Sequence, residues 1–310
     1  MVNKDMLFFP YSADIHLGRI PIFTIIISLL CIGIFYKQSG SEHELMKFAD
    51  GYCAQSWGRN YDVAMSKLSA NSHQQVCSYI MVEAQLSRDV PTYFKEIAEQ
   101  SAPFNSLNRN EGKKFIVEQL TNRFEDYQSK APPYKTADLW YYPDSFNVGR
   151  MISAAFAHGS WDHLAGNLFF FFAFAASIEI IVGNILFPLI IVGLAIGTHT
   201  FYSLMTMANI EALPTVGLSG VVMGMIGLCV YFIPRVNIKC FFWFLIYFKV
   251  FAIPAWILAS WYVGWDVYNL YHDDGSSNVN FAAHVSGAVL GYLTGFLFFR
   301  KRKQEILALS

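Results

Sequence analysis

A serine and a histidine each open a strongly apolar segment of this chain, and together they suggest hydrolytic chemistry. Ser219 lies in the run Gly-Leu-Ser-Gly at 217–220, and His284 lies in Ala-His-Val-Ser-Gly at 283–287. A hydroxyl paired with an imidazole can act as a nucleophile with its general base. Since both residues stand at the mouths of apolar runs, the pattern predicts this chemistry inside a lipid bilayer.

The residues around Ser219 predict a helix start. Pro214 and the turn-like stretch 215–220 precede an apolar run. Free backbone N–H groups and the positive end of the helix dipole favour an anion at such a position, as a tetrahedral oxyanion would be. The alternative interpretation is an N-cap serine without a chemical role, which is common.

Glycines strengthen the pairing of the two segments. They recur at close to four-residue spacing in both: Gly220, Gly224 and Gly227 after the serine, and Gly287, Gly291 and Gly295 after the histidine. Stripes of small residues let membrane helices approach closely. Docking the two stripes would bring Ser219 and His284 to the same end of one interface. The alternative is that the glycines serve helix packing only.

A third polar element contains His158, His163 and Asn167. His163 and Asn167 are four residues apart and therefore share one helix face. An imidazole and an amide on one face can donate hydrogen bonds to a developing oxyanion. An interhelical hydrogen bond is the alternative role for Asn167. We interpret His158 as a structural residue in the approach to this helix.

Composition indicates a membrane protein. The 310 residues are 54% hydrophobic and only 15% charged, whereas soluble domains carry about 25% charged residues. The charge concentrates between residues 37 and 150, which predicts one extramembrane insertion. The net charge of −1 argues against a nucleic-acid partner. No metal or nucleotide motif appears, so we expect no cofactor.

The apolar runs predict an all-α polytopic membrane protein with six transmembrane helices. The expected spans are 20–36, 164–183, 184–207, 219–233, 252–265 and 284–299. Basic residues in short flanks stay in the cytoplasm, and Arg300–Lys303 follow the last span, while Arg235 and Lys239 follow the fourth. Both termini are then cytoplasmic. Glu179, inside the second span, is expected to accept structural hydrogen bonds.

The chain then divides into five parts. These are a cytoplasmic N-terminus (1–19), the first transmembrane helix (20–36), an extracytoplasmic helical insertion (37–149), a core (150–300) and a cytoplasmic tail (301–310). Amphipathic spacing between breakers predicts helices over 42–57, 62–68, 73–86, 90–100 and 112–128. Cys53 and Cys77 both fall in the insertion, where a disulfide and two free thiols are both allowed. The insertion either caps the core or docks a substrate or partner.

These motifs resemble those of the rhomboid intramembrane serine proteases. The resemblance covers residues 150–299 and the first span. It rests on the order and spacing of four groups: His158-x4-His163-x3-Asn167, Gly217-Leu218-Ser219-Gly220, Ala283-His284-x2-Gly287-x3-Gly291, and residues 250–256 as the start of the fifth helix. Bacterial members often carry Trp-Arg before the second span, where this chain has Gly149-Arg150. The arginine is kept, and the missing tryptophan bears on lipid anchoring of that loop.

The resemblance implies a six-helix rhomboid-like bundle and a set of residue roles. Ser219 would be the nucleophile and His284 the general base, as a dyad without a carboxylate. Asn167, His163 and the backbone N–H of Ser219 would form the oxyanion hole. Arg150, His158 and the glycines at 217, 220, 287 and 291 would support the site.

The expected substrate is a single-span membrane protein cut near its outer end at small side chains. The loop over 268–280 is a candidate gate. A bacterial inner membrane is the expected location.

Other function classes fit less well. A zinc intramembrane protease needs His-Glu-x-x-His, which is absent. An aspartyl intramembrane protease needs two intramembrane aspartates. In the later predicted spans, Asp266 is the only candidate, and it lies at the end of a span. A transporter would favour inverted repeats, and none is seen. A non-catalytic rhomboid relative, acting as a membrane chaperone or trafficking factor, is the main alternative, although such relatives typically lack the serine or the histidine.

Overall fold

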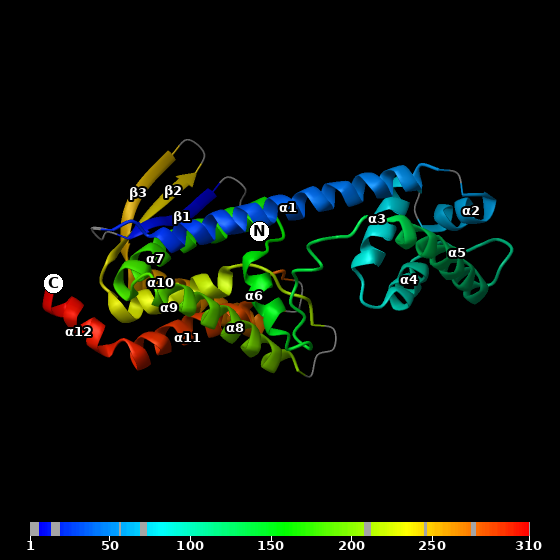
Figure 1. Ribbon diagram of the computed structural model, residues 1–310. Helices are drawn as coiled ribbons and strands as arrows, with labels where there is room; N and C mark the ends of the chain where they lie inside the picture. Colours follow the sequence, from blue (N-terminus) through cyan, green and yellow to red (C-terminus); the bar gives the residue numbers. More distant parts are fainter. Residues whose placement is uncertain are drawn as a thin grey trace. The chain divides into compact units, whose positions relative to one another are not determined.

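The chain folds into two compact units. The computed structural model describes residues 6–13, 19–55, 57–68, 73–207, 212–244, 247–273 and 277–309. One unit, here called the membrane unit, comprises residues 1–36 and 139–310, and the other, the insertion unit, comprises residues 37–138. The described residues are mostly helical (Figure 1). The chain passes from the membrane unit into the insertion unit within the long helix α1 (Ile22–Cys53).

Helices build most of the membrane unit. Besides the first part of α1 they are α6 (Val148–Phe156), α7 (Trp161–Val182), α8 (Leu186–Thr206), α9 (Ser219–Phe232), α10 (Ala255–His272), α11 (Phe281–Phe298) and α12 (Arg300–Leu309). Each predicted span overlaps one of six helices: α1, α7, α8, α9, α10 and α11. Four of them, α1, α7, α8 and α11, are long and apolar enough to cross a membrane. The apolar α9 is shorter, with 14 residues. The polytopic, predominantly helical membrane fold is confirmed.

The outer faces of these helices are apolar. Their exposed large side chains include Ile26, Leu29, Phe169, Phe172, Leu189, Leu204, Leu293 and Leu297. Contiguous apolar surface of this kind is rare on soluble monomers. Lipid chains would cover it in a bilayer, where helices also satisfy their own backbone hydrogen bonds. The apolar surface of the folded chain therefore agrees with the prediction, made from composition, that this is an integral membrane protein.

Glu179 ties α7 to the start of α1. Its buried carboxylate accepts hydrogen bonds from the backbone N–H of Phe23 at 2.8 Å and of Thr24 at 2.7 Å, and from the Thr24 hydroxyl at 2.7 Å. A carboxylate at a helix N-terminus satisfies free N–H groups and complements the helix dipole. This agrees with the structural role expected for Glu179.

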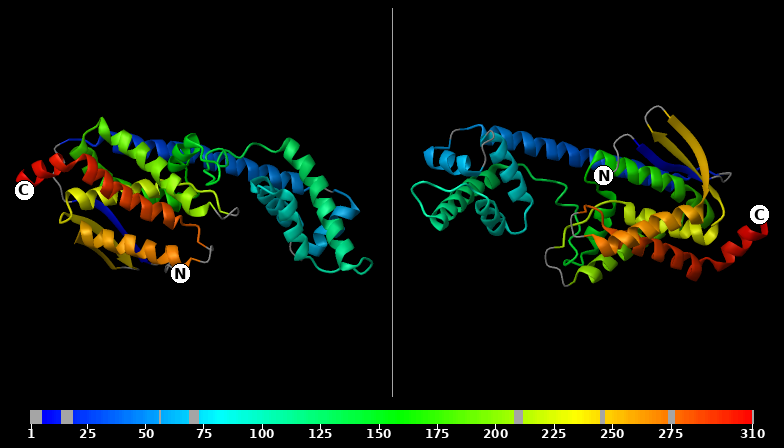
Figure 2. Two further views of the ribbon diagram at one scale, coloured as in Figure 1. Left: turned by 90° about the horizontal axis from the view of Figure 1, so that it is seen from below. Right: turned by 180° about the vertical axis from the view of Figure 1, so that it is seen from behind.

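A small sheet was not predicted. Strands β1 (Met6–Ala13), β2 (Asn237–Phe244) and β3 (Tyr247–Pro254) form an antiparallel sheet in the order β1-β2-β3, and β1 lies against α7 (Figure 2). The fifth helix was expected from about Ala252, but it begins at Ala255, so the stretch 250–254 belongs to a strand. Aromatic and β-branched residues favour strands, and a proline biases the residue before it toward extended backbone.

The insertion unit is a small helical domain with its own core. After the end of α1 it contains α2 (Arg59–Leu68), α3 (His73–Leu86), α4 (Val90–Glu99) and α5 (Arg109–Lys130). Each helix overlaps a predicted one, although the first predicted segment is the continuation of α1. The unit ends at Asp138 rather than at residue 149. The reason is that later residues pack with the membrane unit, where Tyr141 pairs with the backbone of Thr215.

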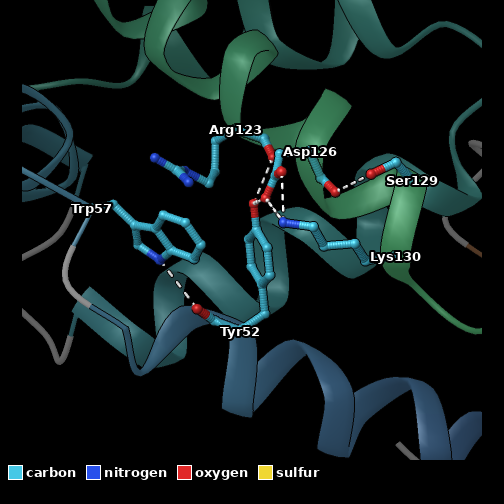
Figure 3. Close-up of polar contacts among 6 residues, drawn as sticks. All are labelled: Tyr52, Trp57, Arg123, Asp126, Ser129 and Lys130. Carbon is cyan, nitrogen blue, oxygen red and sulfur yellow. Dashed lines mark hydrogen bonds and ion pairs between the residues drawn. The ribbon is translucent and has the colours of Figure 1, made fainter.

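Covalent and polar contacts fix the end of α1 within the insertion unit. Cys53 and Cys77 form a disulfide, which settles the alternative left open by the sequence. The hydroxyl of Tyr52 donates to the carboxylate of Asp126 at 2.8 Å, and the guanidinium of Arg123 lies 3.6 Å from the ring centre of Trp57 (Figure 3). The disulfide joins α1 to α3, and the other two contacts join α5 to α1 and to the segment that follows it.

Candidate active site

Ser219 is the first residue of α9, as its sequence context predicts. It follows Leu218 at the N-cap position, and no side chain of the described residues caps this helix end. The first N–H groups of a helix lack intrahelical acceptors, and the helix dipole makes this end positive. The partly exposed Ser219 therefore lies beside backbone donors that can stabilise a developing negative charge.

Three other segments fix the loop that leads into α9. The backbones of Thr215 and Tyr141 exchange two hydrogen bonds of 2.9 and 3.1 Å, and the N–H of Gly217 donates to the carbonyl of Ala154 in α6 at 2.8 Å. The side-chain amide of Asn280, the N-cap residue of α11, donates to the Thr215 hydroxyl at 3.2 Å. The segment around Tyr141, helix α6 and the start of α11 thus all hold this loop in place.

Two side-chain donors of α7 converge on Gly217. A Cβ atom added to this glycine would lie 2.8 Å from Nε2 of His163 and 3.5 Å from Nδ2 of Asn167. The N–H of Gly159 donates to Nδ1 of His163 at 3.5 Å, so Nε2 carries the proton and is a donor. Asn167 is only 7% exposed, and its Nδ2 makes no hydrogen bond with any described residue. Both donors therefore remain available beside the loop before α9.

Gly217 permits this close approach. Its φ of +123° is a backbone conformation that residues with a side chain rarely adopt. The missing Cβ leaves room for the His163 ring, which would otherwise clash at Cε1 and Nε2.

The two glycine stripes meet in the folded protein. A Cβ on Gly287 would lie 2.2 Å from the carbonyl oxygen of Gly220, and one on Gly291 would lie 1.9 Å from that of Gly224. Contacts this short place the backbones of α9 and α11 directly against each other, which only glycine allows.

This packing sets the positions of the serine and the histidine. Ser219 immediately precedes Gly220 on α9, and His284 lies about one turn before Gly287 on α11. Since Gly220 and Gly287 touch, Ser219 and His284 lie at the same end of the interface between these helices. Both side chains are partly exposed, so the site is not sealed inside the helix bundle.

His284 has a partner that sequence reasoning did not assign. Its Nδ1 lies 3.1 Å from Oδ2 of Asp266, a buried residue of α10. The family resemblance implies a dyad without a carboxylate. In the structure, however, a carboxylate lies within hydrogen-bond distance of the histidine. The sequence signal was weak, because the two residues are 18 positions apart and lie on different helices.

The remaining predicted site residues lie around this centre. His158 is buried, and its ring packs edge-on against His163 with centroids 5.2 Å apart. Desolvation by burial lowers the pKa of His158 to about 3, so the ring is neutral near pH 7. Arg150 lies in the first turn of α6, where the side chain of Asn147 caps its backbone N–H at 3.0 Å.

Part of the predicted gate is helical. Residues 268–272 form the end of α10, because this helix runs to His272. Residues 274–276 of the predicted gate lie outside the described residues. Across the described parts of the chain, no group of three or more His, Cys, Asp or Glu side chains is arranged to hold a metal ion.

Comparison with models of protein families gives a match. A family model described as the Rhomboid domain matches residues 145–301, which includes α7 to α11 and every site residue predicted from the sequence. The comparisons with curated proteins and with solved structures found no match.

Proposed function

Since this chain belongs to the rhomboid family, we propose that it is an intramembrane serine endopeptidase. Its substrate would be a single-span membrane protein, cleaved in or near the transmembrane segment. The observation that carries the proposal is the convergence of two α7 donors on the loop that leads into Ser219, at the end of the interface where His284 also lies.

Acylation would use Ser219 and His284. Neutral His284 accepts the Ser219 proton at Nε2 while the serine oxygen attacks the peptide carbonyl. The tetrahedral oxyanion is stabilised by Nε2–H of His163, Nδ2–H of Asn167 and the backbone N–H of Ser219. His284 then gives the proton to the leaving amine, and an acyl-enzyme remains.

Deacylation repeats the same steps with water. Water gives a proton to His284 as it attacks the acyl group, and the serine is released with its proton restored. Water must reach the site from an aqueous face. The partial exposure of Ser219 and His284 supports such access.

The site would open to the extracytoplasmic face. The helices α7, α9 and α11 carry the site residues in their first two turns, while the basic run 300–303 follows the other end of α11. Basic flanks stay in the cytoplasm, so the site lies on the opposite side. The insertion between α1 and α7 would share that side, which suits a role in docking substrate or a partner.

The decisive experiment compares the wild-type protein with Ser219→Ala and His284→Ala against a model single-span substrate. We expect cleavage by the wild type only. A fluorophosphonate probe, which reacts with activated serines, should label the wild type and not Ser219→Ala.

Ser28→Ala is the matched control, because the side chain of Ser28 in α1 donates to the carbonyl of Thr24 at 2.8 Å and has no other hydrogen bond among the described residues. It should cleave and label like the wild type. Equal cleavage by Ser219→Ala, or no cleavage and no labelling by the wild type, would favour a non-catalytic rhomboid-like chaperone or trafficking factor.

A further inference from the structure

Asp266 occupies an unusual position for a carboxylate. It lies within α10, and the residue is 8% exposed. Its Oδ2 is 3.1 Å from Nδ1 of His284, whose side chain is 16% exposed. The pair therefore joins α10 to α11 beside the candidate nucleophile and away from most solvent.

The surroundings make this contact informative. An ionised carboxylate in an apolar helix bundle is costly unless it is paired or hydrogen-bonded. Among the described residues, the side chain of Asp266 has a hydrogen bond to His284 and to no other residue. The free energy of burying this carboxylate is thus offset mainly through the imidazole that we propose as the general base.

We propose that Asp266 is a positioning residue that extends the serine–histidine pair, an inference that rests on the proposed function. Its carboxylate accepts the Nδ1–H of His284, which selects the tautomer with a free lone pair at Nε2. That nitrogen then takes the Ser219 proton during attack. Asp266 keeps its negative charge throughout and stabilises the imidazolium until the proton passes to the leaving amine.

The test is steady-state cleavage by Asp266→Asn, with rates divided by the amount of monodisperse folded protein. The amide keeps the shape of the side chain and removes its charge. Neutralising the equivalent carboxylate of a Ser-His-Asp triad lowers kcat by up to about 10⁴-fold. Here we expect kcat to fall by at least about tenfold, while KM stays within about twofold, because substrate contacts are unchanged.

Glu179→Gln is the matched control. It removes another buried carboxylate of the membrane unit, one that holds the start of α1. It should lower the thermal stability and leave kcat per folded molecule unchanged. If Asp266→Asn does not accumulate as folded protein, Asp266→Glu takes its place. The longer side chain displaces the imidazole and should also lower kcat without raising KM.

The outcomes separate the two proposals. A folded Asp266 variant with wild-type kcat overturns the positioning role. So does a variant whose only defect is a smaller folded fraction, because that is the result of lost packing. A wild-type protein that neither cleaves nor reacts with a fluorophosphonate overturns the protease assignment itself, and the positioning role falls with it.

Discussion

Asn167 is a buried amide whose Nδ2 makes no hydrogen bond with any described residue, although it lies beside Gly217. A buried donor of this kind is costly for folding. This cost is explained if the Asn167 amide donates to the oxyanion, which forms beside Gly217 only during the reaction. His163 supplies a second donor from one helical turn earlier on α7.

Replacing Asn167 with alanine should therefore reduce catalysis more than stability. Loss of one oxyanion donor costs about 10²–10³-fold in kcat, and we expect a decrease of this size with little change in KM. The measurement is substrate cleavage together with a thermal unfolding curve. Asn184→Ala is the control, because Asn184 is exposed between α7 and α8 and should have no effect on kcat. An equal loss in both variants would contradict the assignment.

At the level of elements, the contact between α9 and α11 decides where the site residues lie. The helices approach so closely because glycines stand wherever the two backbones meet. The register of this contact aligns the first turns of both helices. A displacement of one helix along the other would separate Ser219 from His284 without altering either residue.

Gly291→Ala tests this contact. Its Cβ would lie 1.9 Å from the carbonyl oxygen of Gly224, so the helices must separate or slide. Overpacking a tight interface typically costs about 1–3 kcal/mol, and we expect a lower unfolding temperature together with reduced kcat.

The control is Gly193→Ala in α8, where a Cβ would meet no atom within 4 Å. Alanine is favoured over glycine inside a helix by about 0.5–1 kcal/mol, so this variant should be at least as stable as the wild type. If Gly291→Ala and Gly193→Ala have the same unfolding temperature and the same kcat, close backbone contact does not explain why glycines recur along α11.

At the level of the whole molecule, the two units differ in chemistry. The insertion unit has a disulfide and many surface charges, whereas the membrane unit keeps Cys31, Cys229 and Cys240 as buried free thiols. Disulfides persist in oxidising compartments. The pairing is what we expect of the extracytoplasmic insertion proposed above.

Counting reactive thiols tests this orientation. The chain has five cysteines, of which three are free. Protein taken from cells, denatured and treated with a polyethylene-glycol maleimide should gain three adducts before reduction and five after it. Cys53→Ser with Cys77→Ser should gain three under both conditions. Five adducts on unreduced wild-type protein would place the insertion in a reducing compartment.

Much of the site is encoded in local sequence. Apolar run lengths predicted the helices, and a serine after a turn marked the start of α9. The spacing of His163 and Asn167 placed both on one face of α7, because residues four apart align on a helix. The glycine spacing pointed to the α9–α11 interface for the same reason.

Tertiary structure alone decided three pairings: Asp266 with His284, Cys53 with Cys77, and the N-terminal strand with residues 237–244. Each joins segments whose meeting depends on the path of the chain between them, which no local periodicity specifies. The strands also show why an apolar run is ambiguous. In β3 apolar residues stand on both faces, including the exposed Phe248 and Val250, so the run lacks the alternation that separates strand from helix. Periodicity therefore identified the helices but not the strands, and packing determined which residues meet.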